Sequence, residues 1–110
     1  MTTNGSSGEI IISVSEDIID LVPRFMDNRR KDVESIHKAL EVGDYETVRG
    51  LGHAIKGSGG TFGFDEATEI GIRIEDAAKA RNADVIRQLT HELLEYFDRV
   101  RVISVPSEDI

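Results

Sequence analysis

The residues best suited to chemistry lie in one stretch, residues 51–64, which reads LGHAIKGSGGTFGF. If the stretch is helical, with about 100° per residue, Leu51 and Ile55 fall on an apolar side opposite His53. His53 is therefore expected to face away from the core, with Lys56 one turn further along on the same side. A neutral imidazole is a good nucleophile near neutral pH, and a neighbouring lysine can neutralise an anion delivered to it. This pair could attack an anionic electrophile.

The glycines around His53 are a second unusual feature. Each glycine inside a helix costs up to about 1 kcal/mol relative to alanine, so Gly57, Gly59 and Gly60 imply a need for space. A neighbouring helix could approach on the Gly59 side. Another molecule could approach His53 beside Gly57 and Gly60, where Arg49 adds a second cation.

Simpler interpretations of the stretch also exist. A lone histidine in a small domain is most often an ordinary surface or core residue, and a Gly-Ser-Gly-Gly run can simply end a helix. A phosphate-binding loop fits less well. Ser58 stands where a Walker-type loop has its lysine, and Phe62 where a dinucleotide fingerprint has its third glycine. The joint pattern favours a functional site.

The run HAIKGSGGTFG, residues 53–63, resembles the signature of histidine-containing phosphotransfer (HPt) domains. The resemblance extends over roughly residues 16 to 102, and the motif is also similar to the phosphate-accepting domain of chemotaxis histidine kinases. It implies a four-helix bundle whose exposed histidine takes a phosphoryl group from a receiver aspartate or a kinase and passes it to a receiver aspartate.

The resemblance also implies roles for individual residues. His53 would be the phosphorylated nucleophile, acting through Nε2. Lys56 would hold the phosphoryl oxygens after transfer, with Arg49 as a weaker electrostatic helper. Gly57 and Gly60 would leave steric access for the partner.

Glu75 is a further candidate that rests on the resemblance to the chemotaxis-kinase domain. There, a glutamate on the next helix, twenty-two residues after the histidine, hydrogen-bonds the imidazole. In that role Glu75 would orient the ring of His53 by accepting from Nδ1–H, which leaves Nε2 free. The alternative is that Glu75 is a solvated residue at the edge of an apolar face.

The other histidines have weaker claims. His37 is predicted to be a boundary residue beside the apolar side of its helix. His91 and Glu92 begin like a zinc-protease motif, but Glu95 stands where the second histidine belongs. With three scattered histidines and no cysteines, neither a metal site nor an intrinsic cofactor is expected.

Composition narrows the class of protein. The 110 residues, 39% hydrophobic and 31% charged, suit one soluble domain with a modest core. No signal peptide or membrane span is visible, and the absence of cysteine fits the cytoplasm. The net charge of −8 disfavours nucleic acid or an anionic membrane as partner. A monomer is expected.

Four amphipathic segments separated by short turns predict an all-α fold, an antiparallel up-and-down four-helix bundle over residues 15–102. A short extra helix is expected to begin at Ser15, with Pro23 either starting the next helix or kinking this one. Residues 1–14 are expected to be flexible or extended, and 103–110 to form a tail. Stop and cap signals mark the helix boundaries: Gly43, Asp44, Asp65 and Asn82.

The two ends of the chain share a β-branched composition, at residues 10–14 and 102–105. Four antiparallel helices return the chain to the side where it began, so the termini are expected to be adjacent. The segments are predicted to pair as a short antiparallel ribbon. The alternative is two frayed ends, because isolated two-stranded ribbons are marginal.

The predicted function is that of a phosphoryl carrier without kinase activity of its own. The sequence offers neither nucleotide-loop spacing nor the alternating strands and helices of a receiver. The phosphoryl group is therefore expected from a partner, either a histidine kinase or a response-regulator receiver domain that brings its own Mg²⁺. The alternative is a helical docking domain that binds signalling partners through the same face without transfer.

Overall fold

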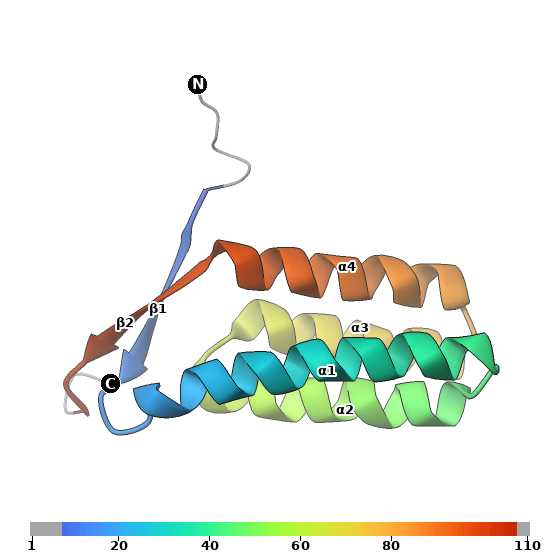
Figure 1. Cartoon of the computed structure of the whole chain (residues 1–110), viewed down its shortest axis with the longest axis horizontal. Coiled ribbons are helices and arrows are strands. Elements are labelled where there is room, and N and C mark those ends of the chain that lie inside the picture. Colours follow the sequence, from blue (N-terminus) through green and yellow to red (C-terminus); the bar gives the residue numbers. More distant parts are fainter. Residues whose placement is uncertain (1–7, 108–110) are drawn as a thin grey trace.

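The computed structural model describes residues 8–107. Four helices joined by short turns form an antiparallel up-and-down bundle, as Figure 1 shows. Two short strands and one turn of 3-10 helix lie at one end of it. In chain order the elements are β1 (Ile10–Ser15), η2 (Ile19–Leu21), α1 (Val22–Glu41), α2 (Tyr45–Phe62), α3 (Asp65–Lys79), α4 (Ala83–Arg99) and β2 (Val100–Val105).

Side-chain caps fix the starts of two helices, as the sequence predicts. The carboxylate of Asp44 accepts from the backbone N–H of Thr47 at 3.1 Å at the start of α2. The amide oxygen of Asn82 accepts from the backbone N–H of Val85 at 3.2 Å at the start of α4. Each bond satisfies a backbone donor that the first turn of a helix leaves unpaired. Gly43, just after α1, adopts the left-handed conformation with φ +70°, which ends this helix as the sequence predicts.

The predicted cap of α3 is wrong by one residue. Phe64 occupies the cap position without a side-chain hydrogen bond, and Asp65 is the first residue of the helix. The Phe64 side chain is fully buried, so packing fixes this corner. Asp65 instead places its charge in the first turn, where the helix dipole favours an acid.

The predicted N-terminal extra helix is also wrong. Strand β1 and η2 occupy this region, and Pro23 lies in the first turn of α1. The β-branched run at 10–14 favours extended structure. Pro23 fits the first turn because its missing N–H has no partner to lose there. A single 3-10 turn is all that remains of the predicted helix.

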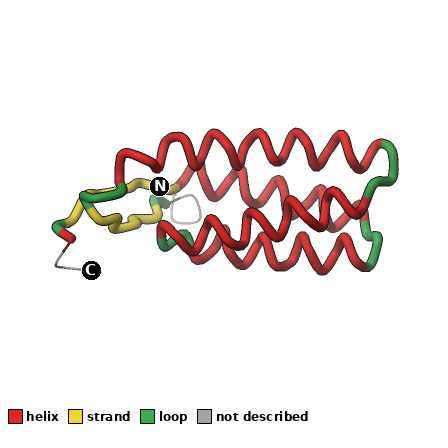
Figure 2. Tube along the Cα trace, turned by 90° about the horizontal axis from the view of Figure 1, so that it is seen from below, coloured by secondary structure: helices red, strands yellow, loops and turns green. Residues whose placement is uncertain are grey.

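The terminal strands do pair, but in parallel rather than antiparallel orientation. Ile10 pairs with Val100 and Ser15 with Val105. Strand β2 continues directly from α4, whereas the chain turns back between β1 and α1, where Glu16 donates to the carbonyl of Val105 at 2.8 Å. Both strands therefore run in the same direction at one end of the bundle (Figures 1 and 2). The sequence prediction overlooked this reversal.

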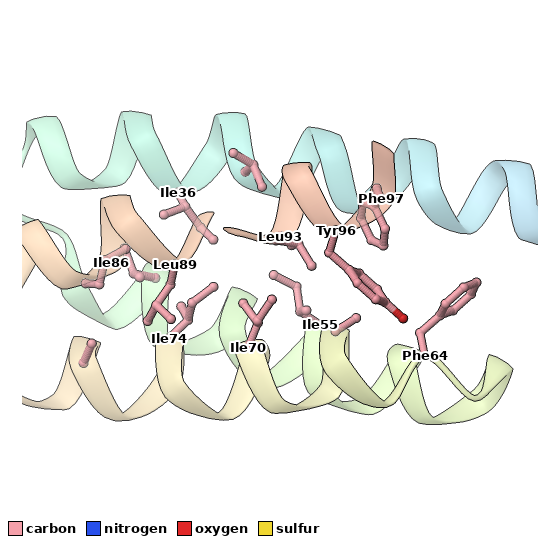
Figure 3. Close-up of a cluster of buried hydrophobic side chains, with 14 of the residues drawn as sticks. Ile36, Ile55, Phe64, Ile70, Ile74, Ile86, Leu89, Leu93, Tyr96 and Phe97 are labelled. Atoms are coloured by element: carbon pink, nitrogen blue, oxygen red, sulfur yellow. The ribbon is translucent and has the colours of Figure 1, made fainter. Parts of the chain in front are cut away.

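The core runs along the centre of the bundle between the four helices. Ile36, Ile55, Ile74 and Leu93 are fully buried there, as Figure 3 shows. Beside the ribbon the core becomes aromatic, and the Phe25 and Phe64 rings stack with centroids 5.1 Å apart. The aromatic cluster contains Phe25, Phe62, Phe64, Tyr96 and Phe97. The apolar sides of α1, α2, α3 and α4 thus fix how each helix is rotated.

Candidate functional site

His53 lies on the exposed side of α2. Val48 and Ile55, on the opposite side of the same helix, have no exposed surface, whereas the His53 side chain is 65% exposed. The amphipathic pattern thus turns the imidazole outward, as the sequence predicts. An exposed ring on a rigid helix is accessible to a partner without unfolding.

Helices α2 and α3 approach each other through glycines. A Cβ at Gly71 would lie 2.5 Å from the backbone nitrogen of Lys56, and one at Gly52 would lie 2.9 Å from that of Glu75. Gly59 is equally crowded, because a Cβ there would lie 2.8 Å from the Thr68 hydroxyl. A close neighbour was predicted from the sequence at Gly59 but not at Gly52 or Gly71. The signal in the sequence for such close helix packing is a glycine inside an amphipathic helix, as at Gly52 and Gly71.

This close approach brings Glu75 to the other site residues. Glu75 lies on α3 one turn after Gly71, and its side chain is only 13% exposed. Its Oε2 lies 3.5 Å from Nδ1 of His53, and its Oε1 lies 3.7 Å from Nζ of Lys56. One largely buried carboxylate therefore faces both an imidazole nitrogen and an ammonium group.

Arg49 extends the positive side of the site by one turn of α2. Its guanidinium pairs with Glu46 on the same helix, where Nε donates to Oε1 at 3.4 Å. Hydrogen bonding to Glu46 raises the pKa of Arg49 and lowers that of Glu46. The partner of Arg49 is therefore the exposed carboxylate of Glu46, which a more highly charged anion could displace.

The exposed glycines leave open space beside the ring. A Cβ at Gly57 would meet nothing within 4 Å, and one at Gly60 would meet only the Thr68 hydroxyl, at 4.0 Å. Neither position is needed for helix packing. No side chain at Gly57 or Gly60 therefore projects from the surface of α2 next to His53, and this surface is open to a partner.

A polar contact that the sequence analysis missed anchors α2 to α1. The Arg29 guanidinium donates to the Ser58 hydroxyl, which itself donates to the carbonyl of Ala54 at 2.9 Å. Arg29 also lies 2.7 Å from the carboxylate of Asp32. Burial raises the pKa of Asp32, against the lowering effect of Arg29.

The remaining histidines lie outside this arrangement. His37 is exposed beside α4, and its Nε2 lies 3.0 Å from the buried Thr90 hydroxyl. His91 is exposed on α4. Within residues 8–107, no group of three potential ligand side chains is placed to hold a metal ion.

The geometry suits nucleophilic attack by a histidine on an anionic group. Glu75 faces Nδ1, which leaves Nε2 directed to the accessible side of the ring. Lys56 stands beside the carboxylate and can turn towards an arriving anion, because its side chain is 37% exposed. A nucleophile, a ring-orienting acid and a cation thus meet on the surface of two packed helices.

Comparison with known proteins places this arrangement in a family. The family model described as the Hpt domain matches residues 20–102, about three quarters of the chain. No curated protein and no solved structure matches the sequence. None of the helices in the described part of the chain has the length and apolar character needed to cross a membrane. The matched region contains all four helices and every candidate site residue, and the chain belongs to the Hpt domain family.

Proposed function

We propose that His53 is the phosphorylated residue of this chain and that the domain carries a phosphoryl group between a donor and a receiver aspartate. Hpt domains are histidine phosphotransfer modules of phosphorelays and not kinases. The observation that carries the assignment is the 65% exposed imidazole of His53, with a carboxylate 3.5 Å from its Nδ1. His37 and His91 lack an equivalent carboxylate contact within the described chain.

The transfer step follows from the geometry of the ring. Nε2 of His53 attacks the phosphorus of an aspartyl phosphate in line with the bond that breaks, so that an N–P bond forms and the aspartate leaves as carboxylate. Nδ1 keeps its proton, and Glu75 accepts from it and stabilises the positive charge that the ring acquires. The receiver supplies Mg²⁺ for its own carboxylates and for the phosphoryl oxygens.

Lys56 and Arg49 then act on the transferred group. Lys56 moves its ammonium group from Glu75 to the phosphoryl oxygens, where two further negative charges attract it. Arg49 contributes from one turn away after it releases Glu46. Gly57 and Gly60 leave room for the partner loop that carries the aspartate. A cytoplasmic location and a monomeric state stay predictions.

The competing function is a docking domain that has lost transfer but keeps the same face. Such a domain has no need of the set formed by His53, Lys56 and the largely buried Glu75. The contacts among these residues therefore favour transfer.

Transfer can be tested by mass spectrometry. The domain is incubated with a receiver charged by acetyl phosphate in Mg²⁺, and its intact mass is measured before and after mild acid. We expect an acid-labile gain of one phosphoryl group, lost in His53→Gln and kept in the matched variant His91→Gln. No gain from a panel of receivers and histidine kinases would favour the docking domain instead.

A further inference from the structure

A polar cavity opens beside the site, between the start of α2 and the end of α3. Its volume is about 490 Å³, and its walls are Tyr45, Glu46, Arg49, Ala78, Lys79 and Arg81. Three of these six residues are cations and one is an acid. The cavity shares Arg49 with the proposed phosphorylation site, and Lys79 lies one turn of α3 beyond Glu75.

Arg81 occupies a position where helices usually have glycine. It adopts φ +55°, and the backbone around it closes α3 with bonds from Arg81 N–H to Ala78 and from Asn82 N–H to Ala77, at 3.0 and 2.9 Å. This is the Schellman end of a helix, whose left-handed residue is strained for any side chain. The side chain nevertheless has a contact partner, because its guanidinium lies 4.7 Å from the centre of the Tyr45 ring. An outlier of this kind points to a use for the side chain.

The charges of this cavity contrast with those of the whole chain. The net charge is −8, so most of the surface repels an acidic partner. Within residues 8–107, neither Lys79 nor Arg81 has a carboxylate within 4.0 Å, although both are exposed. The two cations are therefore available to an anion from outside.

We propose that this cavity binds an acidic segment of the receiver domain that exchanges a phosphoryl group with His53. The proposal rests on the function proposed above, because it places the partner against the same pair of helices. A partner that reaches His53 must cover the adjacent surface of α2 and α3, and a segment rich in carboxylates is complementary in charge to the three cations that line the cavity there. Arg81 and Lys79 bind carboxylates of that segment, and Tyr45 holds the Arg81 guanidinium in place.

The test removes the two cations without harming the fold. Arg81→Gly suits the left-handed backbone, and Lys79→Gln keeps a good helix former, so the double variant is expected to fold. The control, Lys31→Gln with Lys38→Gln, makes the same change in net charge on the exposed side of α1. The substrate is the phosphorylated receiver that labels the wild-type domain fastest in a panel. Phosphoramidate, a small phosphoryl donor, labels His53 independently of any docking surface.

We expect the double variant to raise the KM for the receiver by roughly threefold to tenfold, with kcat changed less than twofold and a weaker dependence of the rate on salt. Labelling by phosphoramidate stays the same. A KM equal to that of the control variant, or a rise only with a histidine kinase as donor, would overturn the proposal for the cavity alone. Absence of labelling of His53 by either donor would overturn the proposed function as well.

Discussion

Replacing Gly71 with alanine tests how the two helices of the site are held together. A Cβ at this position would lie 2.5 Å from the backbone nitrogen of Lys56, about 0.9 Å inside ordinary van der Waals contact at 3.4 Å. All three of its nearest neighbours are backbone atoms, at Lys56 and Gly52, so no flexible side chain can move aside. The helices themselves must separate.

The expected cost follows from two opposed terms. Overpacking of a tight contact costs typically about 1–3 kcal/mol. Alanine gains back up to about 1 kcal/mol of helix propensity relative to glycine. Because the close contacts at Gly71 are all to backbone atoms, the overpacking cost is expected at about 2–3 kcal/mol, and Gly71→Ala should lower the free energy of unfolding by about 1–2 kcal/mol. For a domain of this size that is a fall in Tm of roughly 4–8 °C for each kcal/mol.

Gly50 provides the matched control. It lies within α2 on the exposed side, and a Cβ there would meet nothing within 4 Å. Gly50→Ala should therefore gain only the propensity term and raise stability by about 0.5–1 kcal/mol. Urea unfolding followed by circular dichroism measures both variants on the same scale.

The site should respond as well as the stability. In the native fold the Glu75 carboxylate lies 3.5 Å from Nδ1 of His53 and 3.7 Å from Nζ of Lys56. Separation of α2 from α3 would lengthen both distances. Phosphoryl transfer by Gly71→Ala should slow, while Gly50→Ala keeps the wild-type rate. Equal stability and equal rates in the two variants would refute the view that Gly71 positions the site.

Other predictions address separate parts of the fold and the site. Burial, with nearby acids, raises the pKa of Tyr96 from 10.0 to about 12, so its hydroxyl loses a proton first in the unfolded state. Stability should consequently fall as the pH rises from about 10 to 12, and Tyr96→Phe should lessen that fall, as measured by Tm. Asn82→Ala removes the cap of α4 and should cost about 1 kcal/mol in urea unfolding, so an unchanged midpoint would contradict the capping role. Glu75→Gln should reduce the share of the Nδ1–H tautomer of His53 and slow phosphoryl transfer moderately. An unchanged tautomer ratio in NMR spectra would contradict the role of Glu75 in orienting the ring.

Much of the bundle could be predicted from the sequence because its signals are local. Helical periodicity identified the buried sides of the helices, and Asp44 and Asn82 marked two helix starts through bonds to residues three positions away. The prediction for the two terminal segments was wrong because their structure depends on contacts that are distant in the sequence. The direction of β1 depends on a reversal before Pro23 and on pairing with a strand some ninety residues later, and neither leaves a periodic pattern.

In the site, too, the features that depend on local sequence could be predicted, and those that depend on contacts between helices could not. The outward direction of His53 and the open space at Gly57 follow from the sequence of α2 alone. The position of Glu75 depends on how closely α3 approaches, which Gly52 and Gly71 determine together. The family resemblance predicted the partner of His53, whereas helical spacing gave no reason to choose Glu75 among the acids of α3. The cavity at Arg81 combines two helix ends, so no single segment could predict it.

The position of the phosphoryl group on the imidazole tests the central claim most directly. The domain, labelled with ¹⁵N and phosphorylated by a receiver, is examined by long-range ¹H–¹⁵N correlation NMR, which distinguishes the two ring nitrogens of each histidine. The account predicts one phosphohistidine, at Nε2 of His53, with Nδ1 still protonated and facing Glu75. A phosphoryl group on Nδ1, or on His37 or His91, would contradict it.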